Sequence, residues 1–181
     1  MANSAKKDPL SLLRDIERRS LDIASGLPQQ EVIKGTSLVI GFRLGDMQLV
    51  TPVDEVAELL TYPHMSKVPG TKSWVRGIAN VRGNLLPIMD LQDYLTRQPT
   101  KLTEKSRVLV VKHEGVFSGL LVGEVYGLKH FQDKALSRKL PDADNFVKSY
   151  MSGSYNQDDE IWGIFSMFAL AKSPLFLQVA V

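Results

Sequence analysis

The stretch Val75–Leu91, VRGIANVRGNLLPIMDL, decides how the rest of the chain is interpreted. It contains Val-Arg-Gly twice, and the apolar run that follows is broken by Pro87 and ends at Asp90. Gly77 and Gly83 allow a backbone with positive φ or a close approach between two backbones. Such a stretch suits the floor of a catalytic site, an anion-binding loop or a surface that binds another protein.

Arg82 is the most informative side chain of this stretch. It lies between Val81 and Gly83, so its guanidinium group projects beside a position that has no side-chain bulk. One interpretation is that Arg82 donates hydrogen bonds to backbone carbonyls at a bulge. The other is that it reaches polar groups of a partner with the five fixed donors of a guanidinium group. The residues alone leave both interpretations open.

Two predicted hairpins lie on either side of this stretch. The strand-like segments LVIGFRL and MQLVTPV flank Gly45-Asp46, and RVLVVKH and VFSGLLVGEV flank Glu114-Gly115. When the chain is overlaid on itself with an offset of 69 residues, the two turns coincide. This overlay indicates two similar β-halves joined by a polar linker near 96–106. Short strands with Gly-rich turns favour small barrels over a parallel sheet.

The remaining segments are predicted from their local signals. Residues 1–7 are expected to form a disordered tail, and 8–26 a helix that Asp8 caps and that ends at Gly26. This helix could pack on the body of the same chain or bind a partner. DLQDYLT is predicted to be a short helix, and EIWGIFSMF a closing strand that a helical ALAKS follows. Residues 132–160 are loop-rich and poorly specified.

Composition excludes several classes of protein. The chain has 181 residues, enough for one domain with a full core. It has no cysteine, which excludes disulfides, thiolate catalysis and cysteine-ligated metals. The formal charge is only +2 and no basic block is visible, so a small β-barrel that binds nucleic acid is a disfavoured alternative. The longest apolar run, 161–171, is shorter than the roughly 20 residues that span a bilayer.

No catalytic or metal-binding constellation is found in the sequence. The three histidines lie far apart and lack the spacing of metal ligands. The acidic residues at 158–160 lack the ligand spacing of a calcium loop. Trp74 and Trp162 lie in strand-like apolar segments, where core or interface packing is the favoured role. We therefore expect no enzymatic activity, no cofactor and no metal. The start of the chain, MANSAKKDPL, has no secretory apolar region, so a cytoplasmic protein is expected.

The segment VPGTKSWVRGIANVRGNLLPIMDL resembles the signature of CheW-like domains, which follows the pattern G-(V/I)-x-N-x-R-G-x-(V/L)-x-P-(V/I)-x-D-L. The segments FRLGDMQLVTPVDEVAELL and SRVLVVKHEGVFSGLLVGEVYGL extend the resemblance over roughly 36–176. The matching signature residues are Gly77, Asn80, Arg82, Gly83, Pro87, Asp90 and Leu91. The N-terminal extension and residues 132–160 depart from the family pattern.

This resemblance implies a mainly β fold with two SH3-like five-stranded β-barrels packed side by side, plus the N-terminal helix. It also implies a non-enzymatic adaptor that couples methyl-accepting chemoreceptors to the regulatory domain of a CheA-type histidine kinase. The receptor tip would lie in the groove between the barrels, so contact with the inner membrane would be indirect, through receptor arrays. The residues leave open whether the chain also self-associates, and its apolar strand edges are compatible with a weak dimer.

The two ends of the chain bear on which chemosensory system is served. The helix ending in ASGLPQQEV and the closing WGIFSMFALAKSPLF resemble CheW-like proteins of type IV pilus (twitching motility) systems. A role in flagellar chemotaxis is the alternative within the family. Both assignments rest on the resemblance alone.

Individual roles can be carried over only at matching positions. Arg82 would be the sensitive arginine near the receptor groove, and Val56, Glu58 and Gly77 match positions implicated in the same contacts. The other signature residues are interpreted as structural. In particular, Asn80, Pro87 and Asp90 are expected to form a turn, a strand end and a helix cap; Gly83 and Leu91 complete the signature.

Overall fold

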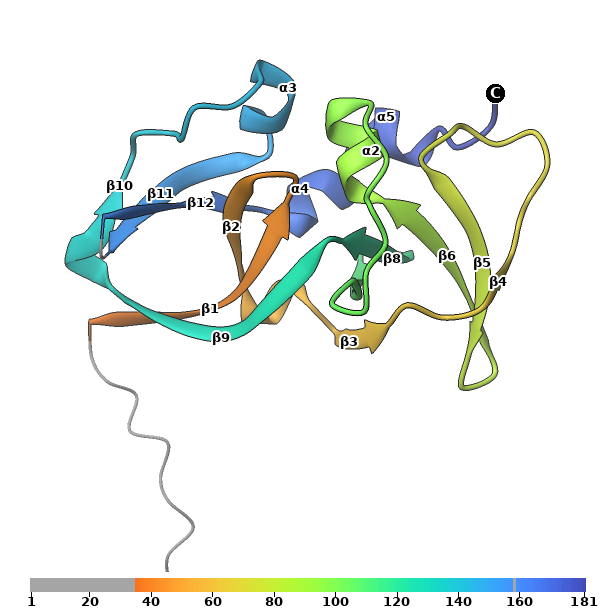
Figure 1. Ribbon diagram of the computed structural model, residues 1–181, viewed down its shortest axis with the longest axis horizontal. Coiled ribbons are helices and arrows are strands. Elements are labelled where there is room, and N and C mark those ends of the chain that lie inside the picture. Colours follow the sequence, from red (N-terminus) through yellow and green to blue (C-terminus); the bar gives the residue numbers. More distant parts are fainter. Residues whose placement is uncertain (1–34, 158) are drawn as a thin grey trace, which may run out of the picture. The chain divides into compact units, whose positions relative to one another are not determined.

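The computed structural model describes residues 35–157 and 159–181, so the predicted tail at 1–7 and helix at 8–26 lie outside the described residues. The described part is mainly β, as predicted, and contains two curled six-stranded sheets (Figure 1). Each sheet has five strands of four residues or more, as the predicted five-stranded barrels require, and one additional strand of two residues.

The first sheet combines strands from the two ends of the described chain. In spatial order its strands are β10 (Leu136–Ser137), β11 (Met151–Gln157), β12 (Glu160–Phe165), β2 (Met47–Pro52), β1 (Thr36–Leu44) and β9 (Glu124–Gln132). Only the pair of β12 with β2 is parallel, with Gly163 opposite Leu49. The strand that lies beside the N-terminal hairpin is thus the last strand of the chain.

The second sheet is built from one continuous stretch, residues 58–122. In spatial order its strands are β3 (Glu58–Thr61), β7 (Arg107–His113), β8 (Val116–Val122), β6 (Asn84–Asp90), β5 (Val75–Val81) and β4 (Met65–Ser66). Here the parallel pair is β6 with β8, with Ile88 opposite Gly119. The two sheets therefore have the same number of strands and one parallel pair each.

The two predicted hairpins are confirmed, but the division into halves at the linker is wrong. The β1–β2 turn lies at Gly45-Asp46 and the β7–β8 turn at Glu114-Gly115. The linker, however, connects two strands of the same sheet, because it follows α2 (Leu91–Thr96) and leads into β7. The sequence pattern of a hairpin predicts the turn and its two strands, but not the sheet to which they belong. Which sheet a hairpin joins depends on packing between strands that lie far apart in the sequence.

Three groups of buried apolar side chains form the core of the described chain. The largest lies between the sheets and includes Phe42 and Leu49 from the first sheet and Leu109 and Leu120 from the second. The two others fill the interior of each sheet. They contain Ala79, Leu86, Ile88, Val108, Val110 and Leu121 in the second sheet, and Val39, Val50, Phe131, Tyr155 and Trp162 in the first. Because successive residues of a strand point to opposite faces, each sheet contributes to the shared core and to its own interior.

Short helices complete the described part of the chain. They are η1 (Val53–Glu55), η2 (Asp133–Ala135), α3 (Asn145–Lys148), α4 (Met167–Ala171) and α5 (Pro174–Leu177). The predicted short helix DLQDYLT is confirmed as α2, whereas the closing strand ends at Phe165 and α4 begins at Met167, two residues before the predicted ALAKS. The region 132–160, which the sequence pattern specified poorly, contains η2, β10, α3 and β11. Figure 1 shows α2, α3 and α5 gathered on one side of the sheets, opposite the side where β3 runs.

Candidate functional site

The central element of the candidate site is the tight turn between β5 and β6. Arg82 and Gly83 form its two central residues, since Val81 pairs with Asn84. Their φ angles are 51° and 86°, and two positive φ angles are what a type I′ hairpin turn requires. The side chain of Asn80 accepts a hydrogen bond from the backbone N–H of Gly83 at 2.9 Å. The sequence Asn-Val-Arg-Gly-Asn therefore holds Arg82 at a defined position on the tip of a hairpin.

The guanidinium group of Arg82 forms an ion pair with Glu58 on the edge strand β3. The distance from Arg82 Nη2 to Glu58 Oε1 is 2.7 Å, and the two side chains are 78% and 31% exposed. Of the two interpretations of Arg82, the structure shows a carboxylate as the partner instead of backbone carbonyls. A guanidinium group has five donors, so one ion pair leaves donors that face the solvent. Arg82 is thus oriented by Glu58 and still accessible.

Val56 lies two residues before Glu58, where η1 ends. Its side chain is partly exposed and packs against the core between the sheets, as do Ile40 of β1 and Val125 of β9. Leu128, which is 61% exposed, lies opposite Ile40 in the β1–β9 pair. Directly opposed residues of neighbouring strands share one face of a sheet. The candidate site thus combines an accessible cation with Val56, which packs on the core between the sheets together with apolar side chains of the first sheet.

Gly77, unlike these residues, is buried against the neighbouring strand β4. It has a φ of 147°. A Cβ atom at this position would collide with the backbone carbonyl oxygen of Ser66 and lie 3.3 Å from Cγ of Met65. Gly77 therefore allows β4 to approach β5 closely, and it presents no side chain to a partner. Of the four predicted contact residues, the structure joins Arg82 and Glu58 in an ion pair, and Val56 lies two residues before Glu58.

Asp90 is a buried hub of hydrogen bonds. Its carboxylate is 0% exposed and caps α2 by accepting a hydrogen bond from the N–H of Asp93 at 3.1 Å. It also accepts hydrogen bonds from the backbone N–H and the hydroxyl of Thr100, at 3.0 and 2.6 Å. Arg76 Nη1 lies 3.9 Å from the same carboxylate. Leu91, the first residue of α2, is fully buried, so this end of the signature stretch positions α2 and the segment that follows it.

Pro87 does not mark a strand end, contrary to the expectation. It lies inside β6, opposite Ile78 of β5. On its other side β6 pairs with β8 only from Ile88 onward. A proline lacks the backbone N–H that a central strand position needs, so it is tolerated just before the doubly paired part of the strand begins.

The pairing of Arg82 with Glu58 has no signal in the sequence. Glu58 lies on β3 and Arg82 in the turn between β5 and β6, and no helical or strand spacing links the two residues.

Within residues 35–157 and 159–181, no group of three or more His, Cys, Asp or Glu side chains could hold a metal ion. In the same part of the chain, no helix is long and apolar enough to cross a membrane. The candidate site therefore consists of an ion pair, a rigid turn and an apolar surface. Such a site can bind and orient a partner.

Comparisons with known proteins agree with this description. The sequence model of the family described as CheW-like domain matches residues 38–174. Protein PilI of Pseudomonas aeruginosa is 44% identical over 174 residues, which cover 96% of this chain and 97% of that protein. The chemotaxis protein CheW of Helicobacter pylori is 28% identical over 113 residues, covering 61% of this chain and 66% of that protein. The crystal structure of the scaffolding protein TtCheW from Thermoanaerobacter tengcongensis is similar in fold, with a TM-score of 0.65 at 21% identity, over 76% of this chain and 94% of that chain.

Proposed function

This chain belongs to the family of CheW-like domains, and from that premise we propose that it is a non-enzymatic adaptor between chemoreceptors and a CheA-type histidine kinase. We further propose that the system it serves controls type IV pilus twitching motility. The similarity to Protein PilI over nearly the whole length of both chains supports this choice. Flagellar chemotaxis is the alternative, supported by the weaker and shorter similarity to chemotaxis proteins named CheW. In either case the adaptor would work on the cytoplasmic side, at receptor arrays of the inner membrane.

The observation that carries the proposal is the geometry of Arg82. Its backbone is held by a tight turn, its side chain is aimed by Glu58, and 78% of that side chain is exposed. An exposed ion pair contributes only about 0–1 kcal/mol to stability. Exchanging the Glu58 carboxylate for a polar group of a receptor would therefore cost little. Arg82 suits a contact that forms and changes as the receptor changes state.

Apolar side chains that pack on the core between the sheets would supply contact area for the same partner. Val56, Ile40 and Val125 pack on the core between the sheets, so their positions are fixed by both sheets at once. Leu128 adds an exposed side chain on the same face as Ile40. An apolar centre beside a polar rim is the usual composition of a protein interface. A receptor tip placed here would sense the relation between the two sheets.

Contacts with the kinase are assigned to the barrels themselves. We propose that the kinase regulatory domain pairs with this chain barrel to barrel, as the family resemblance implies. Weak self-association would use the same faces. Among the described residues, the nine-residue strand β9 is the outermost strand of the first sheet, and its position supports such a contact because a strand edge can add a neighbour.

The test is a reconstituted assay with receptor-containing membranes, the kinase and the full chain. Arg82→Ala should weaken receptor-dependent control of the kinase while thermal unfolding stays within about 1 kcal/mol of the parent chain. The matched control is Arg138→Ala, which removes an exposed arginine that follows β10 of the first sheet. Exchanging the charges in an Arg82→Glu, Glu58→Arg double variant should restore the ion pair without restoring control. Unchanged control in Arg82→Ala would refute the assigned role.

A further inference from the structure

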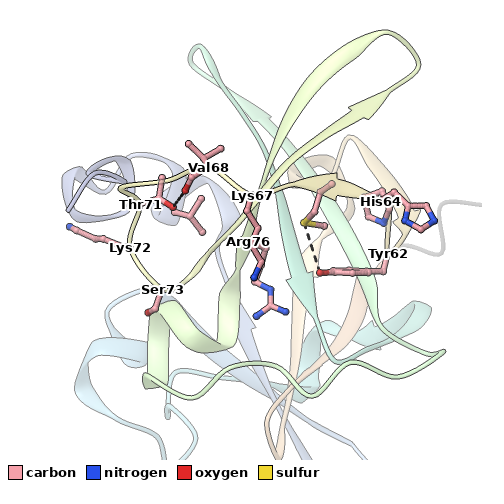
Figure 2. A pocket seen from close by; sticks show the side chains of 11 residues that line it. Tyr62, His64, Lys67, Val68, Thr71, Lys72, Ser73 and Arg76 are labelled. Carbon is pink, nitrogen blue, oxygen red and sulfur yellow. Dashed lines mark hydrogen bonds between the residues drawn. The ribbon is translucent and has the colours of Figure 1, made fainter.

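A second surface, distinct from the Arg82 site, surrounds the segment between β3 and β5. This segment borders a pocket of about 520 Å³ whose lining includes Tyr62, His64, Lys67, Lys72 and Arg76. Figure 2 shows the side chains of Tyr62 and Arg76 directed toward the middle of the pocket, with Lys72 extending from the far part of the loop. Neither Arg82 nor Glu58 lines this pocket.

The charged side chains that line this pocket are all basic. Its lining contains two lysines, an arginine and a histidine, and no carboxylate. No described carboxylate lies within ion-pair distance of Lys67 or Lys72. Arg76 lies 3.9 Å from Asp90, but that carboxylate is buried and already accepts three hydrogen bonds. Asp90 thus compensates Arg76 only in part of its donor capacity, and Lys67 and Lys72 give the pocket a positive field that no described carboxylate pairs with.

A second pocket, of about 410 Å³, shares Lys72 with the first. Its lining is mostly apolar and aromatic, with Lys72 and Arg97 as its only charged residues. Trp74 and Tyr94, at 1% and 2% exposure, form a fixed floor, and Leu175 is 56% exposed. Carboxylates are absent from this lining as well. We call the lining of both pockets together the Lys72 surface.

Arg97 occupies a position that its backbone does not favour. It is the C-terminal cap of α2, with a φ of 59°. Glycine is the usual residue at such a position, because the left-handed conformation costs other residues about 1–2 kcal/mol. No described carboxylate lies within ion-pair distance of Arg97. The chain thus places a cation, at some conformational cost, beside an apolar pocket.

We propose that the Lys72 surface is a docking site for an acidic peptide segment of a partner protein. Carboxylates of that segment contact Arg76, Lys72 and Arg97, and an aliphatic or aromatic side chain inserts beside Leu175. This contact is additional to the receptor and kinase contacts proposed above. The occupant follows from charge complementarity combined with an apolar pocket that one side chain can fill.

The same geometry argues against other anionic partners. Stacking of successive nucleic-acid bases requires exposed aromatic faces along one groove, whereas Trp74 and Tyr94 are buried and the half-buried Tyr62 and Phe146 line different pockets. A lipid surface is bound by an apolar face that enters the bilayer, whereas here the apolar side chains line a hollow whose rim is charged. A protein segment supplies both carboxylates and an insertable side chain.

The binding test uses the full chain with Trp162→Phe, which leaves Trp74 as the only tryptophan. The probes are short peptides of Asp and Glu with a central Leu-Phe or Leu-Leu pair, which contribute no tryptophan signal of their own. We expect at least one probe to change the fluorescence or the side-chain NMR signals of Trp74. Its affinity should fall with salt and be lost when Asn and Gln replace Asp and Glu. Failure of every probe to bind would overturn the proposal.

Two variants assign the binding to this surface. Lys72→Glu and Arg97→Gly should each lower the affinity for the probe by about tenfold or more. Lys134→Glu, on the helix η2 that follows β9, should leave the affinity unchanged. Arg97→Gly removes the cation while relieving the backbone, so lost binding cannot be attributed to unfolding. Arg82→Ala should bind the probe normally, which keeps this proposal separate from the adaptor role. Equal affinity in the Lys72 and Arg97 variants, or equal competition by phosphatidylglycerol vesicles or an oligonucleotide, would show non-specific attraction of anions and overturn it.

Discussion

Gly77→Ala tests whether Gly77 acts through the fold or through a partner. The φ of 147° is a conformation that L residues avoid, at a cost of about 1–3 kcal/mol. The added Cβ would also collide with the carbonyl oxygen of Ser66, so β4 must move away from β5. Overpacking of this kind adds about 1–3 kcal/mol. We therefore expect a total loss of about 2–6 kcal/mol, a large share of the stability of a domain of this size.

The matched control is Gly70→Ala, in the segment that leads into β5. Gly70 has a φ of 70° and no atom within 4 Å of the place that an added methyl group would occupy, so only the conformational cost of about 1–2 kcal/mol applies. Both variants can be followed by urea unfolding, using the fluorescence of the buried Trp74 and Trp162. The expected result is a larger loss for Gly77→Ala than for Gly70→Ala, with unchanged dependence on urea. Equal losses would refute the close-approach argument.

Three further predictions concern single side chains. Asp90→Asn should lower the free energy of unfolding by about 1–3 kcal/mol, because an amide cannot accept all the hydrogen bonds from Asp93 and Thr100; unchanged urea unfolding would contradict the buried network. Burial raises the pKa of Tyr94 well above 10, so the unfolded chain loses the phenol proton at a lower pH than the folded chain does. The free energy of unfolding should therefore fall as the pH rises above about 10, by up to about 1.4 kcal/mol per pH unit. Thermal unfolding at alkaline pH should show a smaller fall for Tyr94→Phe. The hydrogen bond from Lys172 lowers the pKa of the Glu114 carboxyl, so the ion pair is present above that pKa and lost as the pH falls through it; Lys172→Gln should raise the pKa in an NMR titration.

The features predicted correctly from the sequence are those that local chemistry determines. The turns at Gly45-Asp46 and Glu114-Gly115 follow from small or flexible residues between alternating apolar segments. The helix α2 follows from Asp90, whose side chain caps it. The favoured packing of Trp74 and Trp162 in the core is confirmed, since they are 1% and 4% exposed. The resemblance to CheW-like domains is confirmed as well.

The features that were missed depend on distant partners. β11 has the polar sequence MSGSYNQ and no apolar alternation, yet it is paired on both sides, by β10 and β12. The overlay of the two hairpins indicated halves divided at the linker, whereas β1, which precedes the linker, and β9, which follows it, are neighbours in the first sheet. Within the candidate site, residue types identified Arg82 and Glu58 separately. Their ion pair depends on how the β5–β6 hairpin lies over β3, which no local pattern reports.

The interleaved order of the strands has a consequence for synthesis of the chain. The second sheet, from 58–122, can be complete before β11 and β12 leave the ribosome. The first sheet cannot, because β12 must enter between β11 and β2 as the last strand made. Until then one side of β2 is an unpaired edge, and such edges attract other chains. A nascent or truncated chain that ends before β12 would therefore expose an aggregation-prone edge along β2.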